Sequence, residues 1–249
     1  MIWAMYPALR LISVGLLALV LPAAADVLRP ETGVFAGPEA PTPYELRLRR
    51  DLLGGGFSRM CQMLSIPSRE PERAVYMLRT DDGSFVVLSR RFKASLWMAM
   101  QKKMAAGPGK GRSYAIGPEQ QAAALRRVRA AVHTQAAILD PEAGNFVAEG
   151  CKQALLRVAP SAEASPGPDG TTHHASHWDA GTILSGKTWS PEEGSLAADF
   201  VAMEEGLRAF AESELAQRAA AKAELLARVR HLRERLGETA SHPIGKTQD

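Results

Sequence analysis

The first 25 residues have the pattern of a secretory signal peptide, which constrains what the rest of the chain can become. Arg10 is the only charged residue before an apolar run over residues 11–21, and no Arg-Arg pair precedes this run. Pro22 then stands before three alanines that end at Ala25, a small-residue cleavage site. We therefore expect Sec-type export to the periplasm and no membrane span after cleavage. An uncleaved anchor is the alternative, although a span needs ~20 apolar residues.

The two cysteines of the chain agree with export. Cys61 and Cys151 are an even number of thiols in a chain that is expected to reach an oxidising compartment. We predict that they form a disulfide, which would close a long loop and stabilise the fold by ~4–5 kcal/mol in the loop-entropy treatment. Two unrelated buried thiols are the alternative.

Composition along the chain predicts one folded domain between two irregular ends. Residues 26–43 are rich in Pro, Gly and Ala and predict an extended N-terminal arm. Residues 44–237 are expected to form a single α+β domain, and residues 238–249 a disordered tail. No internal repeat is visible.

The clearest local pattern is a β-hairpin. Two apolar, partly β-branched segments, 74–80 and 85–90, flank Asp82-Gly83, a dipeptide that suits a tight turn. Further strands are expected within 57–66 and 171–188. Helical spacing of apolar residues predicts helices over 44–53, 94–106, 118–139 and 146–158.

The last predicted helix begins after Trp189 and continues to Leu236. Ser190 can cap it, with Glu193 completing a capping box, and Ser195 is the alternative cap. We therefore predict the α+β class, with a mainly antiparallel sheet, packed helices and a long C-terminal helix. Apolar residues at alternating spacings of three and four form a seam in this helix, at Leu225, Val229, Leu232 and Leu236.

Charge and motifs argue against several classes of function. The chain has 30 Lys and Arg against 27 Asp and Glu, a balance that gives no reason to expect a nucleic-acid partner. It contains neither a G-x-S-x-G elbow nor an H-E-x-x-H helix. The glycine-rich segment 107–113 departs from the P-loop pattern. We expect no cofactor, and the sequence favours a non-catalytic protein over an enzyme.

Three histidines close together form the most suggestive chemical cluster. His173, His174 and His177 could offer imidazole ligands to a metal ion. On a strand, His174 would point to the face opposite the other two, and His173 and His177 would lie ~13 Å apart. Ordinary strand or loop histidines are therefore the favoured interpretation. A hydrolase built on Asp169, His173, His174 or Asp179 is a second alternative.

Tryptophans are candidates for lining a ligand cleft, because aromatic rings bury large areas. The three candidates are Trp97, Trp178 and Trp189. Core anchors are the favoured interpretation, since aromatic residues make up only 6% of the chain.

Two segments resemble a pattern in uncharacterised exported proteins of proteobacteria. One comprises Asp169-Gly170-Thr171-Thr172-His173 together with the stretch from Gly186 to Ser195, and the other is Pro71-Glu72-Arg73-Ala74-Val75-Tyr76. The resemblance covers residues 44–210. It implies a structural strand position for His173 and transfers no catalytic residue.

The sequence thus predicts a periplasmic, non-catalytic binding or envelope accessory module. Its partner would be an unidentified protein or small molecule of the envelope. The alternatives are an unrecognised periplasmic hydrolase and a metal-binding protein that uses the cluster from His173 to His177.

Overall fold

The computed structural model describes residues 28–31, 34–35, 40–54, 59–106, 117–160 and 169–240. The predicted signal peptide, the glycine-rich segment 107–113 and the tail from residue 241 onward lie outside the described residues. Part of the expected N-terminal arm is described, and Arg29–Pro30 within it forms the short strand β1.

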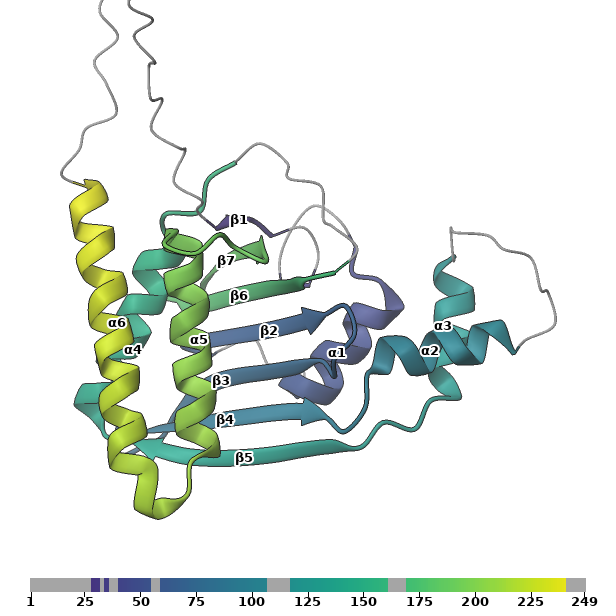
Figure 1. The fold of residues 1–249 in the computed structure, drawn as a ribbon, viewed down its shortest axis with the longest axis horizontal. Coiled ribbons are helices and arrows are strands. Elements are labelled where there is room, and N and C mark those ends of the chain that lie inside the picture. Colours follow the sequence, from purple (N-terminus) through teal and green to yellow (C-terminus); the bar gives the residue numbers. More distant parts are fainter. Residues whose placement is uncertain are drawn as a thin grey trace, which may run out of the picture.

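The centre of the fold is a seven-stranded sheet in the order β1-β7-β6-β2-β3-β4-β5, and every neighbouring pair is antiparallel (Figure 1). This confirms the predicted α+β class with an antiparallel sheet. The strands after β1 are β2 (Cys61–Pro67), β3 (Arg73–Arg79), β4 (Phe85–Phe92), β5 (Val132–Leu139), β6 (Thr171–Asp179) and β7 (Thr182–Trp189).

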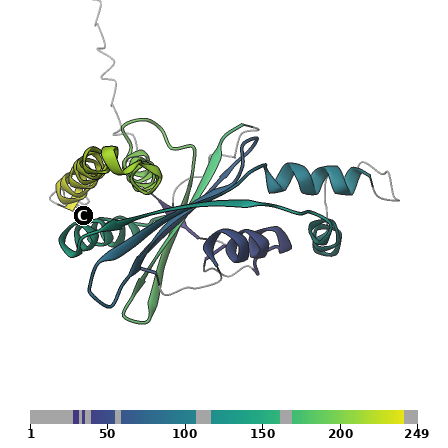
Figure 2. The same cartoon turned by 90° about the horizontal axis from the view of Figure 1, so that it is seen from below.

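Helices pack on both faces of the twisted sheet (Figure 2). One core lies between the sheet and α4 (Pro141–Leu155), α5 (Leu196–Glu212) and α6 (Arg218–Ala240). A second core lies on the other face, beneath α1 (Pro43–Leu53), α2 (Leu96–Ala105) and α3 (Pro118–Arg126). Because both faces are covered, the central strands β2 and β3 are buried along most of their length.

Local signals read from the sequence explain several of these elements. The predicted hairpin is β3–β4, and Gly83 adopts a φ of 85° in its turn, a conformation that favours glycine. Helix α1 begins with a capping box in which Thr42 and Glu45 bond each other's backbone N–H groups. These segments form where local preference and tertiary packing agree.

The predicted disulfide is present between Cys61 and Cys151, whose Cα atoms are 6.2 Å apart. Cys61 begins the central strand β2 and Cys151 lies in α4. Both residues are fully buried in the core beneath α4, α5 and α6. The bond therefore joins this helical layer directly to the middle of the sheet.

The predicted single helix over 118–139 is wrong. The structure has α3 over Pro118–Arg126 and then β5 over Val132–Leu139, which pairs with β4 at the edge of the sheet. In β5 the exposed Ala136 and Ile138 alternate with the buried Ala137 and Leu139. The apolar spacing fitted a helix, but this alternation and the pairing with β4 determine the outcome.

The predicted helix from Trp189 to Leu236 is also divided. Ser195, the alternative cap, begins α5 by accepting a hydrogen bond from the Ala198 N–H. The chain leaves the helix after Glu212, passes through the 3₁₀ turn Leu215–Gln217 and returns as the long α6. The predicted seam is the buried face of α6 and consists of Leu225, Val229, Leu232 and Leu236.

A small residue is required where α4 crosses β4. A Cβ atom added to Gly144 would lie 2.0 Å from Cδ2 of Phe85, whose ring is fully buried. We expect Gly144→Ala to lower the free energy of unfolding by about 1–3 kcal/mol, as overpacked cores do, in urea titrations. Gly237→Ala is the matched helical control, because nothing lies within 4 Å of the added atom. Equal stability of the two variants would contradict this packing.

Removing the disulfide should cost stability without changing the fold. For the double variant Cys61→Ala/Cys151→Ala we expect the free energy of unfolding to fall by about 2–4 kcal/mol, because the unfolded chain regains the entropy of a long loop. Urea titrations of the oxidised protein and the variant measure the difference. Wild-type protein unfolded with a reducing agent should match the variant, and an unchanged midpoint in both samples would refute a structural role.

Candidate functional site

The strand register aligns polar side chains across one face of the sheet, in a line that we call the cross-strand row. The row crosses six strands and lies on the face that carries α5. Its members, in spatial order, are Thr188, His173, Ser65, Arg73, Arg91 and His133. Since alternate residues of a strand point to opposite faces, these paired residues share one face.

The inner half of the row ends in a buried carboxylate from α5. Both Glu204 oxygens are occupied: Ser65 Oγ donates to Oε1, and His173 Nδ1 lies 2.7 Å from Oε2. Ser65, His173 and Glu204 are each at least nine-tenths buried. Burial alone would raise the pKa of Glu204, but the hydrogen bonds and charges of His173, Ser65 and Arg73 outweigh it and hold this pKa below its usual value.

This Ser–His–Glu cluster does not have the geometry of a catalytic triad. In a triad, the serine bonds one imidazole nitrogen and the acid bonds the other. Here Ser65 Oγ, at 3.3 Å, and Glu204 Oε2 both approach Nδ1 of His173. Ser65 is bonded directly to the carboxylate and is fully buried. The cluster therefore fixes α5 to the sheet and does not present an activated nucleophile.

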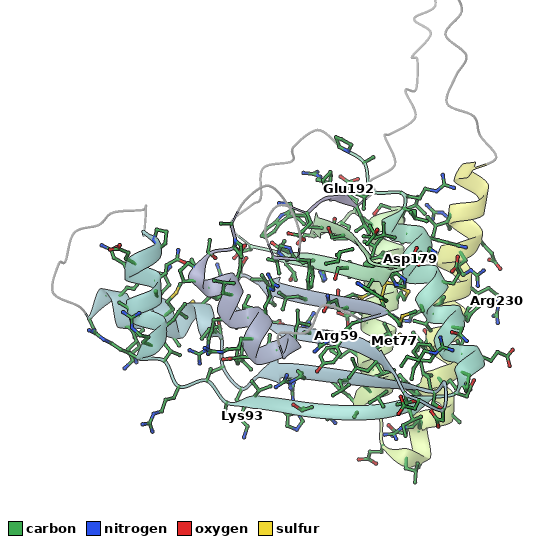
Figure 3. The ribbon with its side chains drawn as sticks, turned by 180° about the vertical axis from the view of Figure 1, so that it is seen from behind. Arg59, Met77, Lys93, Asp179, Glu192 and Arg230 are labelled. Atoms are coloured by element: carbon green, nitrogen blue, oxygen red, sulfur yellow. A yellow bond between two sulfur atoms is a disulfide. The ribbon has the colours of Figure 1, made fainter. Side chains whose placement is uncertain are left out.

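The outer half of the row opens into a cavity of about 680 Å³, which we call the basic cleft. It lies between the last turns of α5 and the ends of β3, β4 and β5 that are farthest from α4. Figure 3 shows this end of the sheet: Lys93, which follows β4 and lines the cleft, lies toward the end opposite to that of Asp179 in β6. The lining residues are Glu70, Pro71, Arg73, Arg91, Phe92, Lys93, His133, Arg208 and Glu212.

Four cationic side chains, those of Arg73, Arg91, Lys93 and Arg208, line the basic cleft together with two carboxylates, Glu70 and Glu212. Arg73 stands opposite Arg91, so that two guanidinium side chains adjoin directly, and Arg91 stands opposite His133. Like charges in such positions destabilise a sheet by about 0.2–1 kcal/mol per pair. Within the described part of the chain, Arg91 and Lys93 have no carboxylate at salt-bridge distance, whereas Arg73 pairs with Glu70 and Glu205.

Two buried guanidinium nitrogens of side chains that line the cleft have no hydrogen-bond partner among the described residues. They are Nε of Arg73 and Nη1 of Arg208. The Arg208 side chain also bonds Glu205, the residue that follows the buried Glu204 on α5. Because both atoms are buried, a ligand in the cleft would not contact them, and other nitrogens of the two side chains bond Glu70 and Glu205. Arg91 and Lys93, which line the cleft with no carboxylate at salt-bridge distance among the described residues, give it the chemistry of an anion-binding site.

The predicted histidine cluster is distributed over both faces of β6. His173 bonds Glu204 on one face, whereas His174 Nδ1 lies 2.9 Å from Glu31 on the other. His177 is buried, which lowers the pKa of its imidazole, and its Nδ1 has no partner. Among the described residues, no group of three or more His, Cys, Asp or Glu side chains is placed to hold a metal ion.

The remaining hydrolase candidates also lie apart. Asp169 is exposed and pairs with Arg69, and Asp179 pairs with Lys152 of α4. Since His173 and His174 point to opposite faces, the four predicted residues do not converge on one site.

The three tryptophans occupy separate places and none lines the basic cleft. Trp97 packs edge-on against Tyr44 at a ring distance of 5.2 Å. Trp178 is partly exposed on β6. The Trp189 ring packs so closely over Gly170 that an added Cβ would lie 2.4 Å from it. Trp97 and Trp189 thus have packing roles.

Sequence reasoning missed the basic cleft. A signal was present at Arg90-Arg91-Phe92-Lys93, where cationic residues close the hairpin strand. The other walls could not be placed, because His133 fell within a predicted helix and Arg208 within a helix of unknown orientation. Their proximity follows from the pairing of β4 with β5 and from the position of α5.

Comparison with protein-family models, with curated proteins and with solved structures found no match. Among the described helices, none is both long and apolar enough to cross a membrane.

The buried cluster predicts a pH-dependent stability. A carboxylate with a lowered pKa stabilises the fold above its unfolded pKa, near 4.3, and this contribution is lost as the pH falls through the folded pKa. Glu204→Gln should therefore lower the free energy of unfolding by about 3 kcal/mol at pH 7, and by much less at pH 3. Urea titrations at both pH values test this.

The exposed Glu224→Gln on α6 is the control and should change little, since Glu224 forms only a surface pair with Arg228. An equal loss at pH 3 and pH 7 for Glu204→Gln would show that its charge does not matter.

Proposed function

We propose that this protein is a non-catalytic binding module that takes up an anionic ligand in the basic cleft. The observation that carries the proposal is the pair of cations Arg91 and Lys93, which line the cavity and have no carboxylate at salt-bridge distance among the described residues. A cavity with two such cations is stabilised by a ligand that supplies negative charge and hydrogen-bond acceptors.

The side chains indicate the chemistry of the ligand. Arginine presents a planar fork of N–H donors that matches carboxylate and phosphate groups. Arg73 and Arg208 are already paired with carboxylates, but Arg91 and Lys93 both lie at the cavity without one among the described residues, so the ligand would carry more than one anionic group. Pro71, which also lines the cavity, would contact the carbon atoms of the ligand.

Binding without chemistry is favoured by the arrangement around the cleft. Two serines on this face of the sheet, Ser65 and Ser89, are buried and bonded to Glu204 and Glu212. The lining residues include no serine, threonine or cysteine that could attack a ligand. The residues proposed for a hydrolase from the sequence do not meet, and those proposed for a metal site are divided between two faces.

We further propose that the module acts in the periplasm. The leader pattern of residues 1–25 and the disulfide between Cys61 and Cys151 support this location. The resemblance to exported proteobacterial proteins is consistent with it.

Binding of a simple polyanion tests the proposal. Pyrophosphate, titrated by calorimetry at constant ionic strength, should bind the wild-type protein, and Arg91→Ala should weaken binding by about tenfold, since the lost charge-assisted bond is worth ~1.5–3 kcal/mol. Arg91→Ala should leave the fold intact because the side chain is exposed.

Lys102→Ala on α2 is the matched control, because it removes an exposed positive charge outside the cleft. It should bind pyrophosphate like the wild type. Equal weakening in both variants would indicate a nonspecific charge effect, and absence of binding to the wild type would refute the proposal.

A further inference from the structure

The strand that borders the basic cleft is the last strand of the sheet. Within the described chain, β5 pairs only with β4, so its other side has no partner strand. A sheet edge of this kind offers a row of unpaired N–H and C=O groups, onto which another extended segment can add.

The register identifies which backbone groups face outward. Lys93 N–H donates to Ala131 C=O at 2.9 Å, so this position is a hydrogen-bonded pair between the segments that continue β4 and β5. In an antiparallel ladder, hydrogen-bonded pairs alternate with non-bonded ones. The residues of β5 whose backbone groups point away from β4 are therefore Val132, Thr134, Ala136 and Ile138.

The edge lacks the features by which proteins usually block strand addition. β5 has eight residues and contains no proline, lysine or other permanently charged residue. Thr134, Ala136 and Ile138 are exposed, and Ile138 retains 67% of its surface. A long edge with an exposed apolar side chain is a surface suited to a partner.

The charges at the two ends of β5 give an added segment a preferred direction. His133, Lys93 and Arg91 surround the start of β5 and belong to the basic cleft. At its other end, a hollow of about 330 Å³ is lined by Asp81, Asp82 and Ile138. An antiparallel partner would place its carboxyl-terminal half beside the basic end and its amino-terminal half beside the acidic end.

We infer that the anionic ligand of this protein is an extended acidic segment of another polypeptide, which adds to β5 as an eighth, antiparallel strand with acidic side chains in its carboxyl-terminal half. This inference rests on the proposed function, since it identifies the anion that the basic cleft receives. Carboxylates opposite His133 lie on the cleft side, within reach of the long Arg91 side chain.

The two faces of the added strand should differ in chemistry. Its cleft-side residues meet the cationic end of the cross-strand row. Its alternate residues lie beside Ala136 and Ile138 on the opposite face, where Val86 pairs with Ile138. The segment is therefore expected to alternate acidic with apolar side chains.

A second copy of this chain would satisfy the site less well. The cleft-side residues of β5 are His133, Gln135, Ala137 and Leu139, and none carries negative charge. Pairing of two β5 strands would therefore place no carboxylate opposite His133. Light scattering of the purified protein, with and without peptide, measures its molar mass and distinguishes a dimer through β5 from a monomer that binds the peptide.

Two synthetic peptides of identical composition test the inference by fluorescence anisotropy. The first, Val-Thr-Val-Thr-Val-Glu-Val-Glu, has glutamates in its carboxyl-terminal half, and the second, Val-Glu-Val-Glu-Val-Thr-Val-Thr, has them in its amino-terminal half. We expect the first to bind at least tenfold more tightly, and Arg91→Ala to remove this preference. Equal affinities of the wild-type protein for both peptides would overturn the predicted direction.

Ala136→Pro tests whether the peptide uses the strand edge. The Ala136 N–H faces outward, so proline removes a donor that β4 does not use, a position that edge strands tolerate. This variant should lose peptide affinity at least tenfold and retain pyrophosphate binding, whereas Ala136→Val should retain both. Unchanged peptide binding by Ala136→Pro would overturn strand addition.

The outcomes separate the two proposals. If pyrophosphate fails to bind the wild-type protein, the proposed function fails. If pyrophosphate binds and neither peptide does, only the strand-addition inference fails. The same holds if light scattering shows a dimer that the first peptide does not dissociate. If Ala136→Pro does not fold, as judged by circular dichroism, the comparison of the two peptides on the wild-type protein still decides.

Discussion

A single buried carboxylate determines how α5 lies on the sheet. Glu204 accepts from Ser65 of β2 and contacts His173 of β6, and a buried ionised group is tolerated only when such partners compensate it. This contact sets both the position and the rotation of the helix. Glu205 and Arg208, on the adjoining turn, are consequently held beside Arg73, and the wall of the basic cleft is complete.

A comparable arrangement secures the opposite face. Glu72, directly before β3, accepts hydrogen bonds from Tyr44 and from the first backbone N–H groups of α2, so one carboxylate joins α1 and α2 at the start of β3. Burial and the adjacent Glu72 charge raise the pKa of Tyr44 far above its usual value, which keeps the phenol a donor. Each face thus uses a buried glutamate to orient its helices, where apolar packing alone would permit sliding.

The sequence predicted those features that depend on local chemistry or on a covalent bond. The hairpin around Gly83, helix α1 and the disulfide of Cys61 were all identified, because turn preference, helical spacing of apolar residues and thiol pairing need few distant contacts. Segment 132–139 was misassigned because its apolar residues fit two periods, and only pairing with β4 decides between them. The cleft was missed for the same reason: Arg73, Arg91 and His133 are distant in sequence and adjacent only through strand register.

The disulfide also governs how the oxidised molecule would respond to mechanical force. Cys61 and Cys151 are 90 residues apart, and the ring that they close holds β2 to β5 together with most of α4. If the molecule were pulled at its two termini, only the chain outside this ring would extend. The fully extended molecule would then be roughly 300 Å shorter than the reduced chain, at ~3.4 Å per enclosed residue. The enclosed strands would then unfold, if at all, as a closed loop that bears no tension along its backbone.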